Sequence, residues 1–103
     1  MPVETARRYE FQYGGIVANA PRESGVFALF RGEELCYVDG ATSIYSALMN
    51  LWDQKGDTPH LGSATSFSFE KCVSEWRHSR TTHVIFRLRP AWNERPDLKA
   101  RER

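Results

Sequence analysis

The sequence predicts one small domain of mixed α/β class, with a three-stranded sheet flanked by helices. The chain has 103 residues, which is enough for one hydrophobic core and too few for two. Hydrophobic residues make up 41% and charged residues 26%, so the composition fits neither a disordered chain nor a coiled coil. Strand-like and helix-like periodicities alternate along the chain, which favours helices covering a sheet. We therefore treat residues 1–103 as a single domain.

A tight hairpin and a helix are the first elements that the patterns predict. Residues 25–31 (GVFALFR) and 34–39 (ELCYVD) are rich in aromatic and β-branched residues, and two residues separate them. The next segment, 42–56, has apolar residues at helical spacing: Ile44, Leu48, Leu51 and Trp52. Thr42 or Ser43 is placed to cap its start, and Gly56 to end it.

Two further helices and one strand are expected in the second half of the chain. Phe69, Cys72, Val73 and Trp76 repeat at helical spacing, which predicts a second helix from Ser66 or Ser68 to Ser79. Residues 83–89 (HVIFRLR) alternate and predict a strand with an outward arginine face, ended by the proline at 90. Residues 97–103 (DLKARER) predict a last helix. The order is thus two strands, two helices, a third strand and a final helix.

The N-terminal segment, residues 1–21, gives the weakest pattern. Tyr9, Phe11 and Tyr13 alternate, as in a short edge strand. No run is apolar for long enough to span a bilayer, and no signal peptide is visible. Cys36 and Cys72 lie far apart within apolar patterns, which predicts two reduced, packed thiols and a cytoplasmic protein.

The formal net charge of +1 conceals a strong asymmetry along the chain. Residues 1–70 carry five basic and nine acidic side chains, whereas residues 71–103 carry nine basic and four acidic ones. The basic part is mostly arginine, whose planar guanidinium suits phosphate oxygens, so we expect a nucleic-acid partner. The predicted nucleic-acid-binding residues are Arg77, Arg80, Arg87 and Arg89.

Residues 25–44 resemble a known family. GVF at 25–27, YVD at 37–39 and the following GATSI at 40–44 resemble the paired motifs of the GIY-YIG nuclease domain. Ala41 and Ile44 fall at the offsets that the family shows where its first helix opens. The family's element order is the one predicted above, so the resemblance covers essentially the whole chain and implies a DNA-binding, endonuclease-like domain.

The resemblance also implies a catalytic site. In active relatives, the site is formed by a tyrosine from each motif, an arginine in the next helix and a glutamate in the final helix. The corresponding residues of this chain are Phe27, Tyr37, Ala47 and Glu102. Cleavage of a phosphodiester needs a base, a cation over the developing charge, and a carboxylate that holds a divalent metal. The implied cofactor is therefore Mg²⁺ or Mn²⁺, held by Glu102, if the domain is active.

Three departures from the family pattern bear on that activity. Phe27 lacks the hydroxyl group, Ala47 stands where the arginine is expected, and Asp39 replaces the motif glycine with a carboxylate that repels phosphate. Loss of one transition-state donor costs about 2.7–4 kcal/mol in comparable enzymes. We expect cleavage to be lost or weakened, and the spacing leaves open whether Arg77 or Arg87 fills the place beside Ala47.

A second interpretation belongs to a different class and stays open at this point. The scaffold can serve as a protein-interaction or oligomerisation module, its arginines solvated or paired with the acidic part of another copy. Trp52 and Trp76 are predicted to be core residues, whereas an exposed Trp92 would be a candidate for stacking on a base. The histidines at 60, 78 and 83 share no metal-ligand spacing, so no zinc site is expected.

Overall fold

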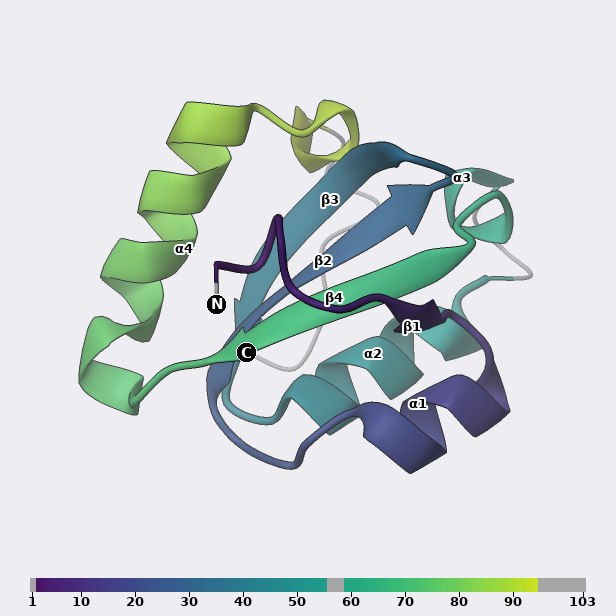
Figure 1. The fold of residues 1–103 in the computed structure, drawn as a ribbon, viewed down its shortest axis with the longest axis horizontal. Helices are drawn as coiled ribbons and strands as arrows, with labels where there is room; N and C mark the ends of the chain where they lie inside the picture. Colours follow the sequence, from purple (N-terminus) through teal and green to yellow (C-terminus); the bar gives the residue numbers. More distant parts are fainter. Residues whose placement is uncertain (1, 56–58, 95–103) are drawn as a thin grey trace.

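The computed structural model describes residues 2–55 and 59–94 of the chain. A four-stranded antiparallel sheet forms its centre, in the order β1-β4-β2-β3 (Figure 1). The strands are β1 (Tyr9–Glu10), β2 (Gly25–Arg31), β3 (Glu34–Ala41) and β4 (Ser66–Lys71). The helices are α1 (Tyr13–Asn19), α2 (Ile44–Asp53), α3 (Pro59–Gly62) and α4 (Ser74–Leu88), followed by a 3-10 turn, η1 (Ala91–Glu94).

Helices cover both faces of the sheet (Figure 1). α1 and α2 lie on one face, over a core that includes Phe27, Leu29 and Phe67. α4 lies on the other face, where Val84 packs in a second cluster with residues of β2 and β3. The two clusters differ because successive residues of a strand point to opposite faces.

The predicted hairpin and first helix are confirmed. β2 and β3 pair through a two-residue turn in which Gly32 has a φ of 61°, a conformation that glycine adopts without strain. The pairing shifts between Leu29 and Phe30, which leaves Cys36 as an extra residue in β3. α2 begins after Ser43, whose Oγ accepts a hydrogen bond from the Ser46 N–H at 3.2 Å.

The predicted second helix is right only for residues 74–79, and the predicted third strand is wrong in type. Ser66–Lys71 is strand β4, where Phe67 and Phe69 alternate with serines and pair with β2. Residues 83–88 belong to α4, which carries Thr81 and Val84 on its buried side. Short apolar runs satisfy both periodicities, and the pairing of β4 with β2, which lies far away in sequence, decides between them. The sheet therefore has four strands and not three.

The N-terminal segment is ordered by the strands beside it. Tyr9 pairs with Phe67 in the short edge strand β1, as predicted, but Tyr13 begins the helix α1. Val3 is fully buried in the α4-side cluster, and its N–H donates to Glu70 at 2.7 Å. This segment therefore completes both faces of the sheet.

The prediction that Trp76 is a core residue is wrong. Trp76 is 66% exposed on α4, whereas Trp92 is 3% exposed and packs in the α2-side core. Cys36 is buried as expected, but Cys72 is only half-buried, and both thiols are free. The predicted last helix, residues 97–103, lies outside the described residues, and no helix within 2–55 and 59–94 is long and apolar enough to cross a membrane.

Candidate nuclease-like site and nucleic-acid interface

The two motif aromatics meet on the α2 side of the β2–β3 hairpin. Tyr37 lies opposite Leu29 in the strand pairing, and Phe27 lies opposite Asp39. The rings of Phe27 and Tyr37 are 6.2 Å apart between centroids, a normal separation for an aromatic pair. The hairpin therefore brings together the positions that the family resemblance singles out.

The hydroxyl of Tyr37 is held by the carboxylate of Asp39. Tyr37 donates to Asp39 Oδ2 at 3.1 Å, and Asp39 Oδ1 accepts from the Gly40 N–H at 2.8 Å. Asp39 thus satisfies two donors of its own strand and places a negative charge beside the only motif hydroxyl that remains. This arrangement opposes the approach of a phosphate group at that point.

The motif positions within the described part of the chain are enclosed in the core. Phe27 and Ala47 are fully buried, and Tyr37 is 1% exposed. All three belong to the cluster that α1 and α2 cover. The place of the expected arginine is therefore filled by apolar packing.

No arginine of α4 replaces the missing one beside Ala47. Arg77 lies on the helix that covers the opposite face of the sheet, and it donates to Ser24 Oγ at 3.3 Å. Its stem passes close to Gly40: a Cβ at Gly40 would lie 3.2 Å from Arg77 Cγ and 2.4 Å from Thr81 Oγ1. Glycine at position 40 thus allows α4 to approach β3.

Two of the four predicted nucleic-acid-binding arginines are ion-paired within the fold. Arg80 makes two hydrogen bonds to Glu70, at 2.6 and 3.0 Å, and hydrogen bonding to this carboxylate raises the pKa of its guanidinium. Arg87 pairs with Glu4. Burial by itself would raise the pKa of the Glu4 carboxyl, but hydrogen bonds and the charges of Arg87 and Arg80 lower it below its ordinary value of 4.5.

The other two arginines differ in their surroundings. Arg77 is half-buried against β3, whereas Arg89 is exposed and ends α4 with a φ of 48°. The guanidinium of Arg89 lies 5.6 Å from the centre of the Phe86 ring. Arg87 and Arg89 are therefore not on an outward strand face, as the sequence predicts, but on and just after the helix.

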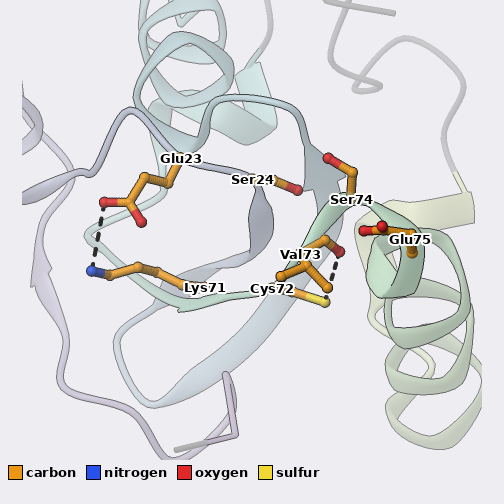
Figure 2. Close-up of a pocket in the computed structure, with 7 residues that line it drawn as sticks. All are labelled: Glu23, Ser24, Lys71, Cys72, Val73, Ser74 and Glu75. Atoms are coloured by element: carbon orange, nitrogen blue, oxygen red, sulfur yellow. Dashed lines mark hydrogen bonds and ion pairs between the residues drawn. The ribbon is translucent and has the colours of Figure 1, made fainter.

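A hollow of about 480 Å³ lies where β4 leads into α4 (Figure 2). Figure 2 shows Glu23 and Lys71 facing each other on one side, with Nζ and Oε2 3.6 Å apart, and Cys72 and Glu75 near the start of α4 on the other. The thiol of Cys72 lies 3.5 Å from the carbonyl of Val73. Lys71 and Glu23 neutralise each other, and Glu75 leaves the lining with one surplus carboxylate, so the hollow does not favour an anion.

The described residues do not supply a metal site. Within 2–55 and 59–94, no group of three His, Cys, Asp or Glu side chains is placed to hold an ion. Asp39, beside Tyr37, is a single carboxylate that already accepts two hydrogen bonds. The predicted metal ligand, Glu102, lies outside the described residues.

Comparison with solved structures identifies the architecture. The chain is similar to the GIY-YIG N-terminal endonuclease domain of UvrC from Thermotoga maritima, in its form bound to magnesium, with 19% identity and a TM-score of 0.63. The match covers 72% of this chain and 86% of that one. This chain has the GIY-YIG fold. Two point mutants of the same domain, each bound to the catalytic divalent cation, match with the same TM-score and the same coverage, at 18% and 21% identity.

At this level of identity the likeness establishes the GIY-YIG fold alone. No protein-family model matches the sequence, and a search of curated proteins finds no match. The GIY-YIG fold confirms the order of elements implied by the resemblance, with β4 as the third main strand and α4 as the helix that follows it.

Sequence reasoning missed the exposed aromatic residues of α4. Trp76 and Phe86 are 66% and 71% exposed. The signal was present in the spacing: once residues 74–88 form one helix, Thr81 and Val84 mark its buried side, and Trp76 and Phe86 fall outside it.

Proposed function

We propose that this GIY-YIG-fold domain binds nucleic acid and that its metal-dependent phosphodiester cleavage is lost or weakened. The observation that carries the proposal is the enclosure of Phe27, Tyr37 and Ala47 in a fold that the chain shares with an endonuclease domain. Phe27 brings no hydroxyl, Ala47 brings no cation, and Tyr37 donates to Asp39. A cleavage site needs reactive groups in contact with its substrate, and these side chains are buried.

Binding of nucleic acid is supported by the basic character of α4 and its C-terminal end. Arg77, Arg80, Arg87 and Arg89 all lie on α4 or directly after it, on the face of the sheet opposite to α2. Arg80 and Arg87 retain 28% and 43% side-chain exposure while paired, so they keep donors for a phosphate. Reduced thiols at Cys36 and Cys72 are the reason for placing the domain in the cytoplasm.

A salt titration tests the proposal and counts the arginines involved. The dissociation constant of a labelled DNA duplex is measured by fluorescence anisotropy at 50 and 200 mM salt. The logarithm of the affinity falls with a slope of about 0.9 per neutralised phosphate, so two arginines predict a loss of about 12-fold and four predict about 150-fold. We expect a value near the lower figure, because Arg80 and Arg87 are already paired. Absence of binding at 50 mM salt would overturn the proposal.

If the domain does cleave, the resemblance assigns Mg²⁺ or Mn²⁺ as the cofactor and Glu102 as a ligand. Asp39 is not assigned as a further ligand, since it accepts hydrogen bonds from Tyr37 and from the Gly40 N–H. A divalent ion supplies charge stabilisation to the leaving oxygen when it is bound. Comparing duplex binding with Mn²⁺ and with EDTA shows whether the ion also contributes to affinity.

A further inference from the structure

The outer side of α4 carries an apolar surface that nothing in the described chain covers. Val73, Trp76 and Phe86 are 60%, 66% and 71% exposed. Large apolar side chains that are exposed together mark interaction sites more often than chance exposure does. Trp76 and Phe86 are on the order of 15 Å apart along the helix axis and about 80° apart around it, so they form two separate platforms. We call Val73, Trp76 and Phe86, with Arg89, the α4 outer surface.

One platform adjoins a shallow hollow of about 440 Å³. Val73 and Trp76 give it apolar walls, and Glu75 and Ser79 give it polar ones. An aromatic ring stacks on the face of any base, while a carboxylate and a hydroxyl accept hydrogen bonds from base amino groups. This combination fits a flat heterocycle with polar edges better than it fits an aliphatic side chain.

The charges beside these platforms favour a polyanion. Arg89 lies 5.6 Å from the centre of the Phe86 ring, which places a cation next to the second platform. The segment 74–89 holds four arginines and one glutamate, and with Arg80 and Arg87 paired to Glu70 and Glu4 the segment still keeps a net positive charge. If two copies met through this same surface, two positive segments would face each other, and like charges would oppose that association.

We propose that the α4 outer surface binds single-stranded nucleic acid, with one unpaired base stacked on Trp76 in the hollow and the strand continuing toward Phe86 and Arg89. This inference rests on the proposed function and narrows it. In a duplex the base faces are covered by their neighbours, so only a single strand or an unpaired region offers them to Trp76.

The test compares three variants with two probes. Trp76→Ala removes the first platform, and Tyr13→Ala is the matched control, since Tyr13 is an aromatic residue 57% exposed on α1, on the other side of the sheet. Each protein is titrated by anisotropy with a labelled 12-nucleotide single strand of mixed sequence and with the corresponding duplex. Far-UV circular dichroism checks folding, and Trp76→Phe, which retains an aromatic ring, should recover most of the affinity.

We expect Trp76→Ala to weaken single-strand binding by about 5- to 150-fold and duplex binding by less than twofold, with Tyr13→Ala unchanged on both probes. Unchanged single-strand affinity in folded Trp76→Ala would overturn the inference. A duplex that binds where the single strand does not would overturn it and leave the proposed function standing. Failure of both probes would overturn both. A fall in sedimenting mass on Trp76→Ala, measured without nucleic acid, would instead make this surface an interface between copies.

Discussion

Replacing Ala47 with arginine distinguishes a site that lacks one side chain from a site that has closed. Ala47 is fully buried in the α2-side core together with Phe27 and Tyr37. If only the arginine were missing, Ala47→Arg would restore a cation beside a phosphate. If the position is closed, the variant forces a charged side chain into apolar packing.

The enclosed position predicts a large loss of stability. Desolvating an ion costs several kcal/mol, and overpacking a core adds about 1–3 kcal/mol. The sum is at least about 4 kcal/mol, against a total stability of about 5–15 kcal/mol for a domain of this length. With a urea m-value of about 1–3 kcal/mol/M, the unfolding midpoint of Ala47→Arg should fall by about 1–4 M.

Urea unfolding followed by circular dichroism measures this shift, and Ser46→Arg is the matched control. Ser46 is the neighbouring residue of α2 and is exposed, so the same new side chain should change the free energy of unfolding by less than about 0.5 kcal/mol there. A folded Ala47→Arg protein with the stability of the parent, and with Mn²⁺-dependent nicking of plasmid DNA, would refute the reasoning. It would show that the site is open.

Three further outcomes follow from individual contacts. Asn93 bonds both backbone groups of Val38 on the edge of β3, at 2.8 and 2.7 Å, so Asn93→Ala should lower the free energy of unfolding by about 1–3 kcal/mol, measured by urea denaturation. The lowered pKa of Glu4 means that its contribution to stability is present above pH 4.5, the unfolded value, and is lost as the pH falls through the lower folded value. Thermal unfolding between pH 7 and pH 3 should therefore show a smaller acid-dependent loss in Arg87→Gln than in the parent; equal losses would contradict the assignment. Arg89→Ala should weaken duplex binding and reduce the salt slope by about one, whereas an unchanged slope would remove Arg89 from the interface.

Local signals in the sequence were sufficient to predict the hairpin and α2. The turn at Gly32 and the cap at Ser43 depend on residues close together in the chain, and the structure has both. The types of β4 and α4 could not be predicted locally, because they depend on contacts with residues that are distant in the sequence. Phe69 and Trp76 fit one helical spacing in the sequence. In the structure, Phe69 lies opposite Phe27 in the sheet, whereas Trp76 is exposed on α4.

In the candidate site, too, only the features that depend on residues close together in the chain could be predicted. The hairpin could be predicted from sequence, but the pairing of Phe27 with Asp39 could not, because the extra residue Cys36 shifts the register by one; an unbroken two-residue hairpin would pair Phe27 with Val38. The ion pair of Arg87 with Glu4 could not be predicted, because the two residues lie near opposite ends of the chain. The basic surplus of residues 71–103 therefore overstates the positive charge available to a partner.

One gel experiment tests the central claim, which is binding without efficient cleavage. Supercoiled plasmid is incubated with increasing protein in 50 mM salt with Mn²⁺, and each sample is run both directly and after the protein has been removed. We predict retarded migration in the first set and intact supercoiled plasmid in the second. Plasmid that is never retarded would contradict binding, and complete conversion to the nicked form after protein removal would contradict the loss of cleavage.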